Sequence, residues 1–303
     1  MTVSDEKNEV LGGQLYLIAT PIGNLSDLSP RALKVLEEAD LVAAEDTRTA
    51  AKLLACFGIR GKSMLPYHKH NFRSAGERIL EKLRQGLSVA LTTDAGTPAI
   101  SDPGEDLVRL CAENGIPVTA VPGCCAAVTA LALSGLRTDR FAFEGFLPAA
   151  GKLRRERLQM LAKEERTLIL YSAPHKLRED LRELWEHLGD RRAALCRELT
   201  KRNEEILRTT LSGAAERYKE SDPRGEYVLV IEGCTSAGAS GEGDLPSADV
   251  TALSPAAHLA LYLEKGLSRM DAMKAAAKDR GIPKGAFYRL LLEDSGEAQN
   301  AEK

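Results

Sequence analysis

Hydrophobic positions along residues 14–134 alternate between short apolar, β-branched runs and longer amphipathic stretches. This order is typical of a parallel β-sheet whose strands are joined by helices. Strands are expected at 14–19, 41–44, 88–93 and 118–121. Helix boundaries are expected at Ser29-Pro30, at a capping box formed by 74–77, at Gly86, at 102–105 and along 124–134. The pattern predicts an α/β domain in the first half of the chain.

A second alternating pattern begins after residue 135. Strands are expected at 141–147, 167–171, 193–199, 205–210 and 227–231, with helices at about 151–163, 174–188 and 212–219. Because only a short segment separates 193–199 from 205–210, these two strands should pair as an antiparallel hairpin. The second sheet is therefore predicted to be mixed.

The C-terminal part changes character at residue 233. Residues 233–250 are rich in Gly, Ser and Ala, which predicts a flexible linker. Helices are expected at 256–264, 269–279 and 284–292, with a turn at 281–283, as in a helix-turn-helix. We therefore divide the chain into a disordered tail (1–12), two α/β domains (13–135 and 136–232), the linker (233–250), a helical module (251–294) and a second disordered tail (295–303).

Composition narrows the class of protein. The 303 residues are 44% apolar and 28% charged, as expected for a globular protein with more than one domain. No apolar run approaches the ~20 residues of a membrane span, and the polar N-terminus does not resemble a secretory signal, so a cytoplasmic protein is expected. The net charge of −3 means that any nucleic-acid contact must come from local basic patches. The six cysteines lack the spacing of a metal site, so reduced thiols and no metal are expected.

Proline and glycine cluster where predicted strands of the first domain end. The clusters lie at 20–24 (TPIGN), 94–98 (DAGTP), 101–104 (SDPG) and 122–124 (PGC). Neither G-x-G-x-x-G after a strand nor a P-loop is present, so the common dinucleotide and nucleotide sites lack their main signal. Loops at the carboxyl ends of parallel strands line the ligand crevice of open α/β sheets. The clusters therefore predict one pocket for a nucleoside, although each could simply terminate a strand.

Nine short segments together are more specific than any single motif. They are 19–25 (ATPIGNL), 44–48 (AEDTR), 94–98 (DAGTP), 101–104 (SDPG), 122–123 (PG), 139–141 (DRF), 144–148 (EGFLP), 197–201 (RELTK) and 225–233 (GEYVLVIEG). This combination resembles the tetrapyrrole-methylase superfamily over about residues 14–233. Within that superfamily the chain is most similar to the branch that methylates a cytidine ribose 2′-hydroxyl in 16S ribosomal RNA.

The resemblance implies a two-domain α/β fold of the tetrapyrrole-methylase type, with a small C-terminal helical module. It also implies a homodimer that binds S-adenosylmethionine between its domains, needs no metal, and acts on 16S rRNA or the small ribosomal subunit. The cofactor contacts that it implies are Pro21, Asp94, Gly96, Thr97, Ser101, Cys124, Cys125, Ala126, Ala127, Tyr171 and Ala173.

Methylation of a ribose hydroxyl needs a base or hydrogen-bond acceptor, because the hydroxyl is a weak nucleophile. Glu45 and Asp46, at the end of the second predicted strand, are the candidates. Arg48 could orient a carboxylate or bind phosphate, and Asn24 could align the ribose. The segment 45–48 also has the composition of a helix N-terminus, and both interpretations can hold together. The histidines at 68 and 70 lack a third ligand, which favours a surface loop or an RNA contact over a metal site.

Basic residues in two predicted helices are candidates for contacts with RNA phosphates. They are Lys152, Arg154 and Arg155 in the second domain, and Lys284 and Arg289 in the C-terminal module. A solvated helix face would have a similar sequence. Two other functions stay open, a methyltransferase for a tetrapyrrole small molecule and a non-catalytic RNA-binding relative. The basic segment, the helical module and the motifs at 20–24 and 44–48 favour an rRNA methyltransferase.

Overall fold

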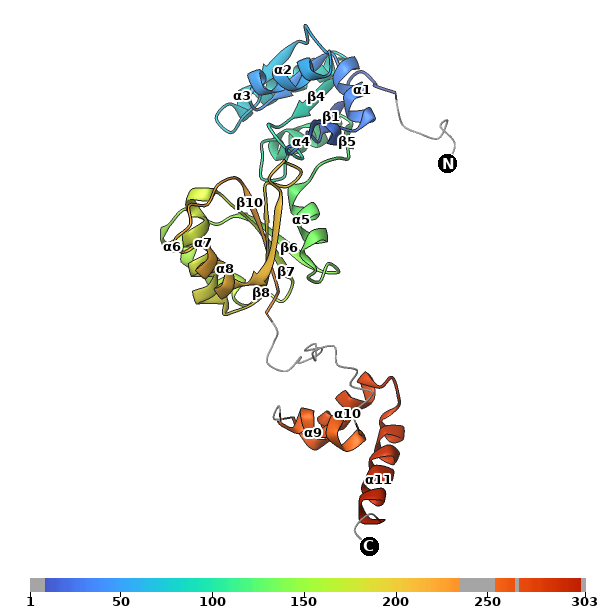
Figure 1. The fold of residues 1–303 in the computed structure, drawn as a ribbon. Helices are drawn as coiled ribbons and strands as arrows, with labels where there is room; N and C mark the ends of the chain where they lie inside the picture. The colour runs from blue at the N-terminus through green and yellow to red at the C-terminus, as the bar shows by residue number, and fades with distance from the viewer. Residues whose placement is uncertain (1–8, 235–253, 265–266, 301–303) are drawn as a thin grey trace. The chain divides into compact units, whose positions relative to one another are not determined.

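The computed structural model describes residues 9–234, 254–264 and 267–300. The chain divides into two compact units, residues 1–235 and 236–303 (Figure 1). Residues 1–8 of the expected N-terminal tail, and the expected linker beyond residue 234, lie outside the described residues. Among the helices that the structure describes, none has both the length and the apolar character needed to cross a membrane.

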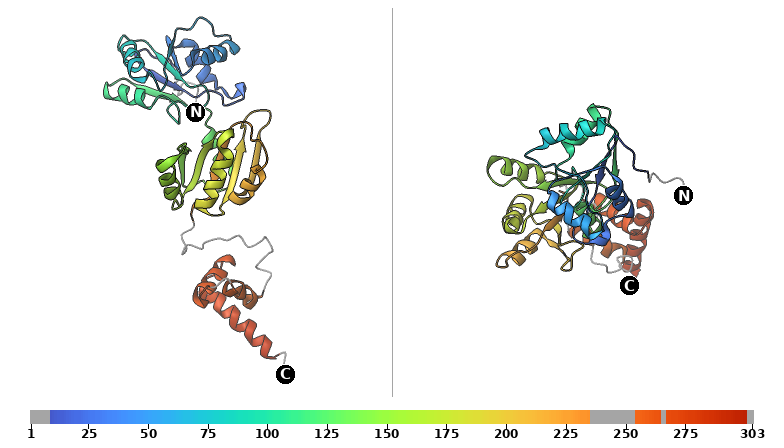
Figure 2. Two further views of the ribbon diagram at one scale, coloured as in Figure 1. Left: turned by 90° about the vertical axis from the view of Figure 1, so that its left-hand side faces the viewer. Right: turned by 90° about the horizontal axis from the view of Figure 1, so that it is seen from above.

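Five parallel strands form the first sheet of the larger unit (Figures 1 and 2). In their order across the sheet they are β3 (Met64–Pro66), β2 (Leu41–Ala44), β4 (Val89–Thr92), β1 (Leu15–Ile18) and β5 (Val118–Val121). The four predicted strands are confirmed. The edge strand β3 was not predicted, because three residues are too few to show an alternating pattern.

Helices cover both faces of this sheet. They are α1 (Pro30–Glu38), α2 (Thr47–Cys56), α3 (Phe72–Arg84) and α4 (Glu105–Glu113), and a short 3₁₀ helix, η2 (Leu25–Asp27), precedes α1. Successive strand residues point to opposite faces. Leu15 and Leu91 therefore pack with α3 and α4, whereas Tyr16 and Ile18 pack with α1 and α2. Burial on both faces explains why the central strands are continuous apolar runs.

The structure confirms some of the predicted helix starts and contradicts others. Ser29 caps α1 as predicted, because its Oγ accepts a hydrogen bond from the Ala32 amide at 3.1 Å. The predicted capping box at 74–77 is wrong: α3 begins at Phe72, so Ser74 already lies inside the helix. The predicted helix start at 102–105 is confirmed, because α4 begins at Glu105; the cap position is Gly104, which offers no side chain.

The second sheet is mixed, as predicted. In spatial order its strands are β6 (Phe141–Phe146), β7 (Thr167–Ser172), β10 (Tyr227–Ile231), β8 (Arg192–Arg197) and β9 (Glu205–Thr210). β6 and β7 are parallel, while β10 runs antiparallel to both of its neighbours. The predicted hairpin is confirmed by the antiparallel pairing of β8 with β9.

Different helices cover the two faces of the second sheet. α6 (Gly151–Leu161), α7 (Pro174–Leu188) and α8 (Leu211–Tyr218) pack on one face. α5 (Ala126–Ser134) packs on the other, where Ala130 and Leu131 contact the face of Ile169 and Val230. We expected α5 to close the first domain, but its packing joins it to the second sheet. Its side chains are apolar all round, so the sequence could not indicate which sheet it covers.

The smaller unit contains α9 (Pro255–Glu264), α10 (Arg269–Asp279) and α11 (Lys284–Asn300), which confirms the three predicted helices. Phe287 is fully buried against the alanines of α10. His258 is also fully buried: its Nε2 lies 3.2 Å from Asp279 Oδ2, and its Nδ1 accepts a hydrogen bond from Arg280 Nε at 3.1 Å. α11 continues to residue 300, so this helix overlaps the first part of the tail that we expected at 295–303.

Candidate functional site

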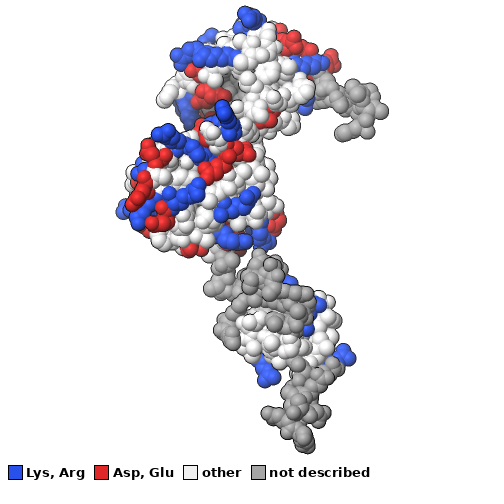
Figure 3. Space-filling view, viewed as in Figure 1, with Lys and Arg blue, Asp and Glu red and all other residues white. Residues whose placement is uncertain are grey.

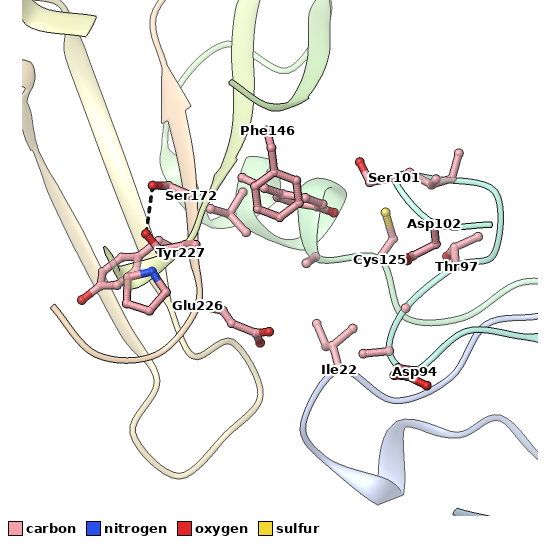
Figure 4. A pocket seen from close by; sticks show the side chains of 18 of the residues that line it. Ile22, Asp94, Thr97, Ser101, Asp102, Cys125, Phe146, Ser172, Glu226 and Tyr227 are labelled. Carbon is pink, nitrogen blue, oxygen red and sulfur yellow. Dashed lines mark hydrogen bonds between the residues drawn. The ribbon is translucent and has the colours of Figure 1, made fainter. Parts of the chain in front are cut away.

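A cavity of about 510 Å³ opens in the larger unit at the carboxyl ends of β1 and β4, and the second sheet supplies its other walls (Figure 4). Pockets for small ligands commonly have volumes of roughly 300–1,000 Å³. The lining residues are Ile22, Asp94, Ala95, Gly96, Thr97, Ile100, Ser101, Asp102, Cys125, Ala126, Phe146, Tyr171, Ser172, Ala173, Pro174, His175, Glu226, Tyr227 and Val228.

Hydrogen bonds tie together the Pro/Gly loops that form one side of the cavity. Thr20 and Gly96 exchange two backbone hydrogen bonds of 2.9 and 3.1 Å, so the loops after β1 and β4 form a small antiparallel bridge. The Thr97 hydroxyl donates to the Cys124 carbonyl at 2.9 Å, which joins the loop after β5. Three loops that are far apart in the sequence therefore meet at one site.

The loop between β4 and α4 has an unusual backbone. Ala99 (φ 70°) and Ser101 (φ 63°) are both left-handed although neither is glycine, and Gly104 has a φ of 145°. For residues other than glycine, such as Ala99 and Ser101, this conformation costs about 1–3 kcal/mol and persists only where the surrounding structure enforces it. Here the Ala99 amide donates to the Pro103 carbonyl at 3.3 Å, which closes the loop on itself. The loop is thereby shaped to place Ser101 and Asp102 at the cavity.

The second sheet contributes an aromatic and hydroxyl wall. The Tyr171 ring contacts Phe143 and Phe146 edge-on, with ring centres 5.1 and 5.4 Å apart. Ser172, beside it on β7, donates to the buried carboxylate of Asp180 on α7 at 2.6 Å. The end of β7 is therefore fixed both by aromatic packing and by a buried hydrogen bond.

Carboxylates dominate the charges near the cavity. Asp94, Asp102 and Glu226 line it, and none of the described residues that line it is a Lys or Arg. Burial, and then repulsion from Glu45, raises the pKa of Asp102 to about 6. Burial and the charge of Asp94 likewise raise the pKa of Glu45, and Lys69 opposes both shifts. The cavity therefore favours a cationic ligand, which would relieve the repulsion between these carboxyl groups.

The structure brings most of the predicted cofactor residues to this cavity. Those that line it are Asp94, Gly96, Thr97, Ser101, Cys125, Ala126, Tyr171 and Ala173. Pro21, Cys124 and Ala127 do not line it, although each is adjacent in sequence to a residue that does. Residues that we did not predict are Ile22, Ile100, Asp102, Phe146, His175 and Glu226, among others. Asp102, Phe146 and Glu226 lie inside segments that carried the resemblance, at 101–104, 144–148 and 225–233, but none of the three had been singled out as a site residue.

The predicted catalytic residues do not share one arrangement. Asp46 caps α2 and forms a two-pronged pair with Arg48, at 3.1 and 2.7 Å. The hydrogen bonds from Arg48 hold the pKa of Asp46 far below its usual value, so Asp46 would be a weaker base than Glu45. Asn24 caps η2 through its side-chain oxygen. Glu45 repels Asp94 and Asp102, which both line the cavity. Of the two acidic candidates, Glu45 is therefore the one that interacts electrostatically with the cavity.

Some of the predicted RNA-binding residues are exposed, and one of them is buried. Arg154 was expected to contact RNA, but this is wrong: only 4% of it is exposed, and it pairs with Asp180 at 2.8 Å and Glu183 at 2.6 Å. Lys152 and Arg155, on the same helix, are exposed. In Figure 3, basic and acidic side chains are mixed over the face of α6 and α7, without a continuous basic patch.

In the smaller unit, Lys284 is partly buried and its Nζ contacts Met270 Sδ at 2.8 Å, while Arg289 is exposed. In the larger unit, His68 and His70, the two histidines of the 67–71 loop, have ring centres 6.0 Å apart. Within the described ranges, no three His, Cys, Asp or Glu side chains gather closely enough to hold a metal ion.

Solved structures with the same arrangement define the class of protein. A cobalt precorrin-4 methyltransferase is 22% identical, with a TM-score of 0.54 over 73% of this chain and 95% of its own. Uroporphyrin-III C-methyltransferase from Thermus thermophilus, solved with S-adenosylhomocysteine, is 20% identical, with a TM-score of 0.50 over 72% of this chain and 97% of its own. The chain has the fold of these two-domain methyltransferases.

Sequence comparison then gives the family. Residues 14–215 match the Tetrapyrrole (Corrin/Porphyrin) Methylases, and the chain belongs to this family. A protein of Synechocystis sp. named ribosomal RNA small subunit methyltransferase I is 45% identical over 93% of this chain and 98% of its own length. The protein of that name from Escherichia coli O157:H7 is 44% identical over 94% and 96%. The predicted family and fold class are confirmed.

Proposed function

We propose that this protein transfers a methyl group from S-adenosylmethionine to a cytidine ribose 2′-hydroxyl in 16S rRNA of the small ribosomal subunit. The observation that carries the proposal is the acidic cavity at which three Pro/Gly loops meet, in a chain 45% identical to a protein named for small-subunit rRNA methylation. The residues of the cavity fit the cofactor, because carboxylates line it and the Tyr171 ring in its wall suits a nucleoside.

Residues of both sheets would hold the cofactor. Asp94 and Asp102 would face its positive charges, and the Gly96 backbone would approach it closely because glycine has no side chain. Tyr171 and Ala173 would close the opposite wall. S-adenosylmethionine supplies an activated methyl group on a sulfonium, so the protein mainly has to align the acceptor oxygen with it.

Glu45 would assist the acceptor hydroxyl. Its pKa is raised by burial and by Asp94, which makes its carboxylate a stronger base than an ordinary surface Glu. It would accept the proton of the 2′-hydroxyl as the new C–O bond forms. Asp46 and Arg48, paired with each other, would hold the start of α2 and so the backbone next to Glu45.

We extend the proposal to the partners and the setting of the reaction. The substrate would be 16S rRNA, either free or in an assembled subunit, and the protein would act in the cytoplasm as a homodimer. Arg155 and Lys152 on α6, and Arg289 and Lys284 in the smaller unit, would bind phosphate groups of the RNA.

The direct test is transfer of a labelled methyl group from S-adenosylmethionine to purified small subunits and to 16S rRNA, with uroporphyrinogen as the competing acceptor. Label in the rRNA, located on one ribose by mass spectrometry, is the expected result. Label in the tetrapyrrole alone would contradict the proposal. Cofactor binding without transfer to any ribosomal acceptor would instead favour a non-catalytic relative.

A further inference from the structure

Phe146 is an exposed aromatic ring at the edge of the cavity. It ends strand β6, lines the cavity, and is nevertheless 59% exposed (Figure 4). By contrast, the neighbouring lining residue Ser172 is only 3% exposed. A ligand held inside a pocket loses most of its surface to the protein. An aromatic ring that stays in solvent at the rim is placed to meet a second molecule that arrives from outside.

The segment that carries this ring is held rigidly. The pairing of β6 with β7 shifts register between Phe143 and Gly145, and Gly145 is left-handed (φ 61°), so the strand turns at this point. Arg157 donates to Glu144 at 2.6 Å on one side of Phe146. Arg154 donates to the Pro148 carbonyl at 3.0 Å on the other. The ring itself rests against Tyr171.

Exposed basic side chains follow a few residues later. Lys152 and Arg155 lie in the first turns of α6, which the same Arg154 connects to the Phe146 segment. An exposed aromatic ring with cations nearby is how proteins bind unpaired nucleotides: the base stacks on the ring, and the cations bind the phosphates.

We propose that Phe146 is the stacking platform for the base of the acceptor nucleotide, with Lys152 and Arg155 binding the adjacent phosphates. This inference rests on the proposed function and names the contact by which the same site recognises RNA. Stacking on Phe146 holds the base at the rim, so that the attached ribose can enter the cavity.

The test uses the full-length protein, with small ribosomal subunits as acceptor and S-adenosylhomocysteine as the probe of the cofactor site. Phe146→Ala, Phe146→Leu and Phe146→Trp are compared with wild type. Phe141→Ala is the matched control, because Phe141 lies on the same strand, is 42% exposed, and does not line the cavity. The measurements are kcat/KM for subunits and the Kd of S-adenosylhomocysteine by calorimetry.

Because Phe146→Ala removes the stacking of one base, we expect it to lower kcat/KM for subunits about five- to 150-fold. Phe146→Trp should restore most of the activity, Phe146→Leu should not, and S-adenosylhomocysteine should bind all variants as it binds wild type. Retained binding also shows that each variant is folded.

Three results would overturn the inference. Parallel weakening of S-adenosylhomocysteine binding in Phe146→Ala would assign the ring to the cofactor. Rescue by Leu equal to that by Trp would show apolar packing without stacking. A Phe146→Ala variant as active as Phe141→Ala would leave the ring without a role. In each of these cases, the proposed function still stands if the wild-type enzyme methylates ribosomal subunits. If the wild-type enzyme is inactive on every ribosomal acceptor, both proposals are wrong.

Discussion

Asp102 lines the cavity with a carboxyl group that holds its proton unusually tightly. Its pKa of about 6 reflects burial first and the nearby carboxylate of Glu45 second, partly offset by Lys69. When the pKa of a carboxyl group is higher in the folded than in the unfolded protein, its contribution to stability is fully present below the pKa of the unfolded state. This contribution is lost as the pH rises through the pKa of the folded state. The relevant window here runs from pH 3.8, the unperturbed value, to about pH 6.

Replacing Asp102 by Asn should therefore stabilise the protein without ligand at pH 8, by about 1–3 kcal/mol, and should have little effect at pH 4. The same change should weaken S-adenosylmethionine binding at pH 8, because the cavity loses a negative charge that faces the ligand's cationic groups. Urea unfolding at pH 4, 6 and 8 measures the first effect and calorimetry the second. Glu37→Gln, on the exposed side of α1, is the control. A variant less stable than wild type at pH 8 would show that ionised Asp102 supports the fold.

Gly104 offers a second test at single-residue scale. Its φ of 145° disfavours any side chain, and an added Cβ would lie 3.0 Å from the Ala99 amide nitrogen and 3.1 Å from Leu91 Cδ2. Gly104→Ala should cost roughly 2 kcal/mol or more of stability and weaken cofactor binding. Gly115→Ala is the matched control, because Gly115 is also left-handed (φ 66°) but has open space around it. Equal unfolding midpoints for the two variants would contradict this account.

At the scale of elements, the buried face and the exposed face of helix α6 have different roles. Arg154 is buried and satisfies Asp180, Glu183 and the Pro148 carbonyl, while Arg155 next to it faces solvent. Removing one partner of a buried ion pair costs about 3–5 kcal/mol, because the remaining charge stays buried. Arg154→Met should therefore destabilise the protein by about that amount, and Arg155→Ala by less than about 0.5 kcal/mol.

Arg155→Ala should nevertheless raise the KM for small subunits, whereas its stability stays near that of wild type. Urea unfolding and methyl-transfer kinetics on the same two variants separate the roles. Equal stability of Arg154→Met and Arg155→Ala would show that the buried network contributes nothing. Unchanged KM in Arg155→Ala would remove α6 from the RNA-binding surface.

The same helix shows where sequence is informative about this protein and where it is not. Short apolar runs and amphipathic stretches predict the strands and most helices, because strands buried on both faces are apolar throughout and helices are buried on one face. In α6, Arg154 has the helical spacing of the buried Leu158 and Leu161, which Arg155 lacks, but the sequence does not show which partners would compensate a buried arginine. The partners of Arg154, Asp180 and Glu183, lie about 26 and 29 residues away. Such long-range pairs arise only in the folded chain.

The cavity follows the same rule. Its glycine- and proline-rich loops could be predicted, since loops at the carboxyl ends of parallel strands must meet at one edge. Glu226 and His175 could not, because they enter from the second sheet and depend on how that sheet packs. Likewise α5 follows β5 directly, yet it covers the second sheet.

At the scale of the whole molecule, the family match ends at residue 215, inside the first compact unit, and the smaller unit has its own core around Phe287. The larger unit contains every residue that lines the cavity. Cofactor binding should therefore depend on the larger unit alone, whereas affinity for RNA should depend on both units. This separation can be tested in the full-length protein by changing charges in the smaller unit.

The double variant Lys284→Ala, Arg289→Ala should bind small subunits more weakly while its Kd for S-adenosylhomocysteine stays at the wild-type value. Each lost phosphate contact should reduce the slope of log affinity against log salt concentration by about 0.7–0.9, so the double variant should lose roughly 1.4–1.8. Binding is measured between about 50 and 200 mM salt, with Lys219→Glu, at the residue that follows α8, as the control. An unchanged slope would exclude these side chains from phosphate binding. A weakened affinity at constant slope would instead indicate that Lys284, which contacts Met270, stabilises the module.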